Sequence, residues 1–117
     1  MPKGHNEIKA RHHAHEIRRR LVAAGLDVSM GHVYEALAAD QSCLSYTEWR
    51  GRGWPMFNTG DNPSMFVVIR MTGLKYPTTH GDLIAKVVHD VLNGKESSYD
   101  LNENDQPGQP DPGGEPG

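Results

Sequence analysis

The sequence has a single cysteine, Cys43, and no apolar run long enough to cross a membrane. A lone cysteine excludes an internal disulfide framework and fits a reducing, intracellular compartment. No stretch approaches the ~18 consecutive apolar residues of a membrane-spanning helix. No apolar signal segment follows the charged N-terminus. We therefore expect a cytoplasmic protein that does not associate with a membrane.

Recognisable catalytic motifs are also missing. The sequence contains no glycine-rich phosphate loop, Gly-x-Ser-x-Gly elbow, paired-carboxylate motif or His-Glu-x-x-His pair. We therefore predict that the protein is not an enzyme and has no catalytic residue, metal or cofactor. His12 and Glu16 have the i, i+4 spacing of two metal ligands on one helix face. Surface histidines that titrate near neutrality are the interpretation we favour.

Charge is unevenly distributed along the chain, although the net charge is only −3. Residues 1–20 hold six Lys and Arg against two Glu, a charge of +4, together with four histidines. Residues 95–117 hold one Lys against six Asp and Glu, a charge of −5. This C-terminal stretch is rich in Asn, Gln, Gly and Pro and predicts a disordered acidic tail. Residues 1–94 are then one compact domain.

Three helices are predicted from apolar periodicity and capping residues. The first begins near Asn6 and ends at Gly25, the second follows a Ser29 cap and covers about 30–39, and the third covers about 79–92. The first helix buries a narrow stripe of small and aliphatic residues: Ala10, Ala14, Ile17, Leu21 and Ala24.

Strands are predicted between the second and third helices. Residues 64–72 (SMFVVIRMT) form the longest apolar run, are rich in β-branched and aromatic residues and are bounded by turn residues, which indicates a central strand. Residues 44–50 alternate roughly and predict an edge strand, and 74–78 predict a short third one. The expected fold class is therefore α+β, with two N-terminal helices, a small antiparallel sheet and a C-terminal helix packed on it.

Two groups of residues are candidates for binding. Helical projection places Arg11, His12, His15, Arg18 and Arg19 on the outer face of the first helix. This face is either a binding surface or an ordinary solvated face. Arg50, Arg52 and Trp54, with Trp49, combine charges that contact phosphates with rings that stack on bases. The same group suits a protein partner, or Trp49 and Trp54 belong to the core.

The predicted element order between residues 33 and 92 resembles the double-stranded-RNA-binding domain. The resemblance is carried by residues 33–37 (VYEAL), 44–48 (LSYTE), 65–69 (MFVVI) and 85–86 (AK). The Gly-Pro-x-His loop of that family falls near 53–56, where no histidine stands. Its lysine-rich helix start falls on 82–86, where only Lys86 remains. The resemblance implies helices flanking a three-stranded sheet, and recognition of duplex RNA.

Residues 28–37 also resemble the recognition helix of helix-turn-helix repressors, with Ser29 as its cap. The resemblance implies that this helix enters a DNA groove, although it contains no Arg or Lys.

The first hypothesis is a small non-enzymatic protein that binds nucleic acid through the basic first helix, helped by Arg50 and Arg52. In this hypothesis the acidic tail folds back and screens the basic face. The alternative is an accessory or inhibitory protein that binds a protein partner through the basic helix, the Trp54 loop or both.

Overall fold

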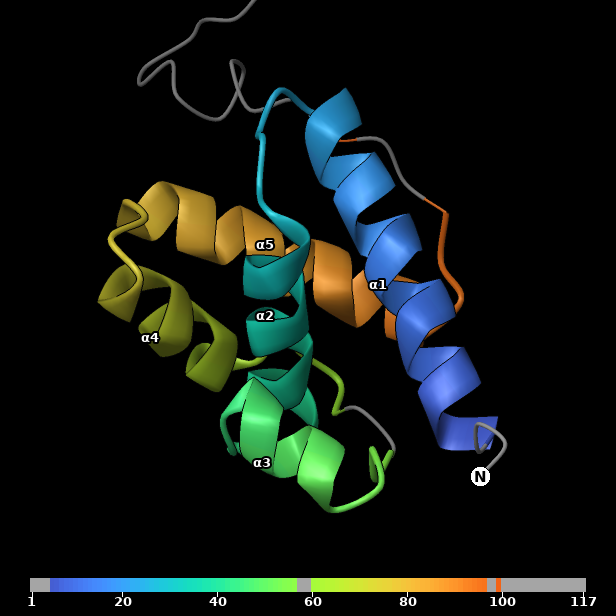
Figure 1. The fold of residues 1–117 in the computed structure, drawn as a ribbon. Helices are drawn as coiled ribbons and strands as arrows, with labels where there is room; N and C mark the ends of the chain where they lie inside the picture. Colours follow the sequence, from blue (N-terminus) through green and yellow to red (C-terminus); the bar gives the residue numbers. More distant parts are fainter. Residues whose placement is uncertain (1–4, 57–59, 97–98, 100–117) are drawn as a thin grey trace, which may run out of the picture.

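The computed structural model describes residues 5–56, 60–96 and 99, and these residues form five helices and no strand (Figure 1). The helices are α1 (His5–Ala23), α2 (Met30–Ser42), α3 (Tyr46–Gly51), α4 (Met65–Gly73) and α5 (Thr78–Leu92). The predicted α+β class is therefore wrong, because the described part of the chain is all-α. The resemblance to the double-stranded-RNA-binding domain is wrong for the same reason, since the described residues contain no sheet to match that topology.

The helices α1, α2 and α5 lie close to their predicted positions. Ala10, Ala14, Ile17 and Leu21 are fully buried on α1, as the predicted stripe required. Gly25 follows α1 with a φ of 100°, a left-handed conformation that glycine adopts without strain. The predicted Ser29 cap on α2 is confirmed, because its side chain accepts a hydrogen bond from the backbone amide of His32 at 3.2 Å.

Helix α2 is the centre of the fold and packs against each of the other four helices. It lies between α1 and α4, with α3 at its C-terminal end and α5 crossing it (Figure 1). Its sequence is rich in small residues, and Ala36, Ala38 and Ala39 are buried together with Val33 and Leu37. Small side chains let neighbouring helices approach closely. A helix enclosed in this way presents no free face to a DNA groove, so the predicted recognition helix is wrong.

The two segments expected to be the main strands are helices instead. Residues 46–51 form α3, which the Ser45 side chain caps by accepting a hydrogen bond from the backbone amide of Glu48. Residues 65–73 form α4, which Ser64 caps by accepting one from the amide of Phe66. The expected third strand is absent as well, since residues 74–77 connect α4 to α5.

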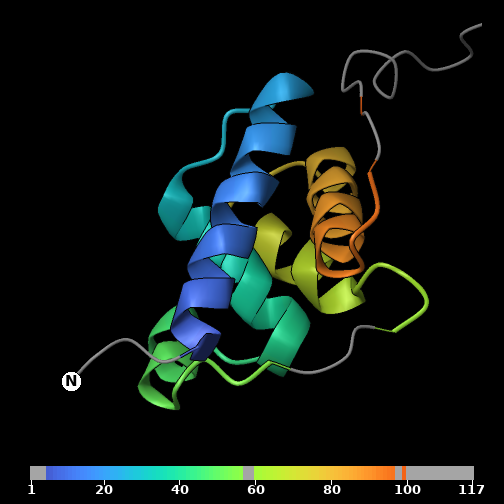
Figure 2. The ribbon, with the colours of Figure 1, turned by 90° about the vertical axis from the view of Figure 1, so that its right-hand side faces the viewer.

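Helices α4 and α5 have the most extensive contact of any helix pair described, and α5 also packs against α1 (Figure 2). Leu83, Ile84, Val87, Val88 and Val91 form the broad buried face of α5. The predicted acidic tail lies mostly outside the described residues, of which only 95, 96 and 99 belong to it. Tyr99 packs against the core. Among the described residues, no helix is long and apolar enough to cross a membrane.

Candidate interaction surface

Two arginines on the C-terminal half of α1, Arg19 and Arg20, are engaged by one carboxylate of their own helix. Arg19 donates to both Glu16 carboxylate oxygens, at 2.9 Å and 2.6 Å, and Arg20 donates to Glu16 Oε2 at 2.8 Å. These hydrogen bonds lower the pKa of Glu16 to about 2. Arg20 also donates to the Lys95 carbonyl at 2.7 Å, which ties the end of the described chain to α1.

Arg11 and Arg18, which the sequence placed on the binding face, also contact other parts of the protein. Arg11 donates to Glu7 Oε2 at 2.9 Å, and its guanidinium lies 5.5 Å from the ring centroid of Trp54. Arg18 donates to the Val28 carbonyl at 2.9 Å and lies 3.5 Å from Asp27 Oδ1. The positive charge of α1 is thus largely compensated within the fold.

The predicted histidines differ from these arginines because His12 and His15 are exposed and neither forms a hydrogen bond or ion pair within the described chain. The neighbouring His13 is half-buried, and burial lowers its pKa, with His12 and Lys9 acting in the same direction. No group of three or more His, Cys, Asp or Glu residues in the described ranges could hold a metal ion.

Trp54 belongs to an aromatic cluster rather than to an exposed loop tip. Its ring lies 5.2 Å from that of Trp49, and it also packs against Tyr34 and Tyr46. Trp49 is fully buried and donates through Nε1 to the Pro55 carbonyl at 2.7 Å, and Trp54 is only 6% exposed. Neither ring therefore has a free face on which a base could stack.

Arg50 and Arg52 remain at the surface near this cluster. Both are exposed, and within residues 5–56, 60–96 and 99 neither side chain donates to an acceptor or pairs with a carboxylate. The structure therefore separates the eight predicted site residues into four environments. Arg11 contacts Trp54, and Arg18 and Arg19 are paired with Asp27 and Glu16, respectively. His12 and His15 are exposed on α1, and Arg50 and Arg52 are exposed at α3.

Most of the large apolar side chains that are exposed among the described residues lie on α4. Met65, Phe66 and Ile69 are 65%, 56% and 61% exposed, whereas Val67, Val68 and Met71 are buried against the other helices. Residues three and four positions apart lie on the same side of a helix. Ile69 is therefore next to both Met65 and Phe66, and the three exposed side chains form one continuous area. We call Met65, Phe66 and Ile69 the α4 patch.

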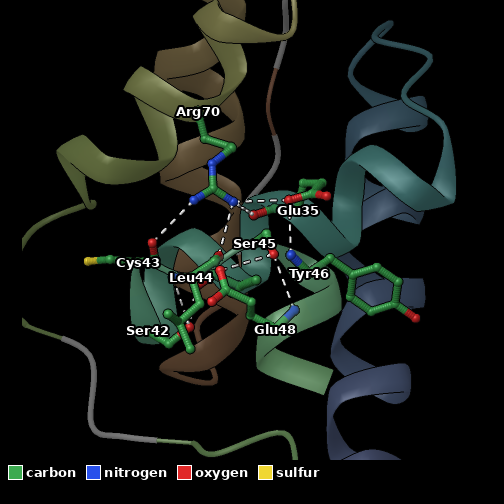
Figure 3. Close-up of polar contacts among 9 residues, drawn as sticks. Glu35, Ser42, Cys43, Leu44, Ser45, Tyr46, Glu48 and Arg70 are labelled. Atoms are coloured by element: carbon green, nitrogen blue, oxygen red, sulfur yellow. Dashed lines mark hydrogen bonds and ion pairs between the residues drawn. The ribbon is translucent and has the colours of Figure 1, made fainter. Parts of the chain in front are cut away.

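The α4 patch carries no charge because the single charged residue of α4 points into the protein. Arg70 donates through Nη1 to Glu35 Oε1 at 3.0 Å and to the Leu44 carbonyl at 3.1 Å, and through Nη2 to the Cys43 carbonyl at 3.4 Å (Figure 3). Glu35 Oε1 also accepts the backbone amide of Tyr46 at 3.1 Å. One guanidinium thus joins the end of α2, the start of α3 and the inner side of α4.

A cavity of about 510 Å³ opens beside the α4 patch, and Phe66 belongs to both. Its other walls come from the end of α2 and from the chain around α3 and include Asp40, Cys43, Leu44, Arg52 and Pro55. Burial raises the pKa of Asp40, although the Gln41 amide opposes the shift. The apolar surface therefore leads into a cavity whose walls include both a guanidinium, from Arg52, and a carboxylate, from Asp40.

Sequence reasoning missed the α4 patch because its residues were assigned to a central strand. As a strand, Met65 and Ile69 share one covered face and Phe66 the other. The overlooked signal was Ser64 directly before the apolar run, since serine is a preferred N-cap. A helix of this sequence has more apolar residues than one buried face can accept.

Comparison with known proteins gave no relatives: no protein-family model, curated protein or solved structure matches this chain.

Proposed function

We propose that this protein is a non-enzymatic interaction module that binds a partner protein through the α4 patch and the adjoining cavity. The observation that carries the proposal is the exposure of Met65, Phe66 and Ile69, each by more than half, on one uncharged helix face. Scattered single apolar residues are ordinary on a protein surface, whereas contiguous ones mark interaction sites.

The surroundings of the α4 patch support the same proposal. Phe66 belongs to both the exposed helix face and the cavity, and Arg52 also lines the cavity. Interfaces characteristically combine a central aromatic or aliphatic anchor with arginine and a polar rim. The partner therefore contributes apolar side chains to the patch and a polar or acidic group to the cavity.

The test is site-specific photocrosslinking in cells of the source organism, with p-benzoylphenylalanine in place of Phe66. Because Phe66 is exposed and the substitute is also aromatic, we expect the fold to be retained and the probe to crosslink to one defined protein. The matched control places the same probe at Val22, an exposed apolar residue on α1 that is 48% exposed. If the two positions give the same crosslinked products, or if neither gives any, the proposal is wrong.

Nucleic-acid binding is the second candidate function, and the free guanidinium groups of Arg50 and Arg52 favour it. Arg19 contributes as well, because its side chain remains 68% exposed despite its contact with Glu16. Phosphate contacts by such groups give an affinity that falls steeply with salt.

The test of this second candidate is fluorescence anisotropy of the full chain with duplex DNA and duplex RNA across a salt series. We expect the double variant Arg50→Ala, Arg52→Ala to bind more weakly and to show a shallower salt dependence. The control variant Lys86→Ala removes an exposed cation on α5. Absence of binding to both duplexes at low salt, or equal losses in the two variants, contradicts nucleic-acid binding at α3.

A further inference from the structure

We infer that the partner of the α4 patch is a second copy of this chain, paired through antiparallel α4 helices about a two-fold axis near Ile69. The inference rests on the proposed function, because it names the partner of the same surface. A two-fold axis brings one surface against itself, so a residue before the axis meets a residue after it on the other copy. The half of the surface before the axis must therefore be complementary in shape and charge to the half after it.

The sizes of the exposed α4 side chains meet this requirement. The bulky Met65 and Phe66 lie in the first half of the helix, and the exposed Thr72 and Gly73 lie in the second half. With Ile69 on the axis, an antiparallel pair places Met65 opposite Gly73 and Phe66 opposite Thr72. A Cβ built on Gly73 meets no atom within 4 Å, so the space beside this residue is open to a large side chain. At each end of the helix pair a large side chain therefore lies against a small one, which allows the two helices to pack closely.

Charges at the two ends of α4 are complementary in the same arrangement. Asp61 precedes α4 and Lys75 follows it, and both are exposed and make no ion pair within the described residues. Antiparallel pairing brings Asp61 of one copy toward Lys75 of the other, once at each end. Between them, Arg70 is turned inward, so no charge on the helix loses its hydration when the two faces meet.

The size of α4 indicates a weak and reversible dimer. Nine helical residues extend over only about 14 Å, which is short for a stable interface that buries roughly 800 Å² on each partner. We therefore expect monomers in dilute solution and dimers at high concentration, in exchange with one another.

The experiment is sedimentation equilibrium of the full chain over a wide concentration range. We expect the weight-average mass to rise from that of the monomer toward that of the dimer. Ile69→Glu places a charge on the axis of the pair and should weaken dimerisation at least about tenfold. Its control is Ile8→Glu, which adds the same charge at a comparably exposed position on α1 and should leave the dimer unchanged.

A second pair of variants tests the antiparallel register. Gly73→Leu fills the space that Met65 of the other copy needs, whereas Gly31→Leu adds the same side chain on α2, where a Cβ also meets nothing within 4 Å. We expect only Gly73→Leu to weaken the dimer. Asp61→Lys and Lys75→Asp should each weaken it, and the two substitutions together should restore it.

Each result decides between the two proposals. A chain that stays monomeric at all concentrations, or a dimer that Ile69→Glu does not weaken, overturns the pairing of two copies. The proposed function then stands or fails on the crosslinking at position 66. A crosslink to a different protein supports the proposed function as an interaction module, and the absence of a specific crosslink contradicts it.

Discussion

Arg70 is the residue on which the packing of three helices depends. Its guanidinium donates hydrogen bonds to the Glu35 carboxylate and to the carbonyls of Cys43 and Leu44, at the junction between α2 and α3. Both side chains of the ion pair are about a quarter exposed, so water screens the pair only in part. Removing the guanidinium leaves a partly buried carboxylate and two carbonyls without their donor.

We expect Arg70→Leu to lower the free energy of unfolding by about 2 kcal/mol, a typical loss for hydrogen bonds to charged groups. Arg70→Lys should lie between this variant and the wild type, because an ammonium cannot span the same three acceptors. Urea denaturation followed by circular dichroism measures both. Arg50→Leu is the control, since Arg50 is exposed and its guanidinium has no acceptor in the described chain. Equal midpoints for Arg70→Leu and Arg50→Leu would contradict the role given to Arg70.

Glu16 makes the stability of the protein sensitive to acid. Its pKa is about 2 in the folded protein, below its ordinary value of 4.5, because Arg19 and Arg20 donate to the carboxylate. A lowered pKa contributes stability that is complete above pH 4.5 and is lost as the pH falls toward 2. We therefore expect Glu16→Gln to be less stable than the wild type near neutrality and the difference to shrink in acid.

Thermal melts recorded from neutral pH down to about pH 2 measure this convergence. Glu96→Gln is the control, because Glu96 is exposed and has no arginine partner among the described residues. A constant gap between Glu16→Gln and the wild type across the pH range would show that the carboxylate charge is not what Arg19 and Arg20 stabilise.

At the scale of the elements, α1, α2 and α5 could be predicted because their apolar residues follow the helical repeat and a cap or stop residue marks an end. The sequence of α4 satisfies two periods at once. Val67, Val68 and Met71 form a helical face, while Met65, Val67, Ile69 and Met71 also alternate as in a strand. Intrinsic β-propensity favoured the strand, and packing against α2 and α5 overrode it.

Helix α3 was missed although its start carries a recognised signal. Ser45 and Glu48 have the spacing of a capping box, and Ser45 accepts the Glu48 amide as that motif requires. The candidate site could be predicted only in part for a related reason. Charge is visible in a sequence, but the partners of Arg11, Arg18 and Arg19 depend on which residues the fold brings together.

The contact between α4 and α5 depends on the absence of a side chain at Gly81. A Cβ built there lies 3.4 Å from Val68 Cγ1 and from the Val68 carbonyl oxygen, which leaves room for a methyl group and nothing larger. We expect Gly81→Ala to keep or raise the free energy of unfolding, by up to about 1 kcal/mol, because alanine is the better helix former.

The larger substitution at the same position should act in the opposite direction. Gly81→Leu forces α4 and α5 apart, and overpacking of this kind costs roughly 1–3 kcal/mol. Chemical denaturation of both variants gives the comparison, with Gly31→Leu as the control at an open position. A Gly81→Leu variant as stable as Gly31→Leu would show that α4 moves away from α5 at no cost.

At the scale of the whole molecule, the last described residues are held against α5 and the C-terminal half of α1. Tyr99 donates its hydroxyl to Asp90 Oδ2 at 2.5 Å, and its ring centroid lies 6.0 Å from the Lys86 ammonium. Arg20 of α1 holds the Lys95 carbonyl nearby. The compact part of the protein thus includes a residue beyond Gly94, where the sequence predicted the domain to end.

We expect Tyr99→Phe to lower the free energy of unfolding by about 1–3 kcal/mol, because Asp90 is only 5% exposed and loses its hydroxyl donor. Tyr46→Phe is the control, since no described residue hydrogen-bonds to the Tyr46 hydroxyl. Urea denaturation compares the two variants. If the two variants lose equal stability, the hydrogen bond from the Tyr99 hydroxyl does not stabilise the buried Asp90 carboxylate.

The edge-to-face contact of the two tryptophans has a spectroscopic consequence. Both indoles of the chain lie in one cluster between α1, α2 and α3. The Trp49 indole donates a hydrogen bond to the carbonyl of Pro55, which lines the cavity. Their emission therefore changes when a ligand enters the cavity or when the core opens. Contacts confined to Met65 and Ile69 leave it unaltered, so intrinsic fluorescence can tell a partner that fills the cavity from one that covers only the outer surface of α4.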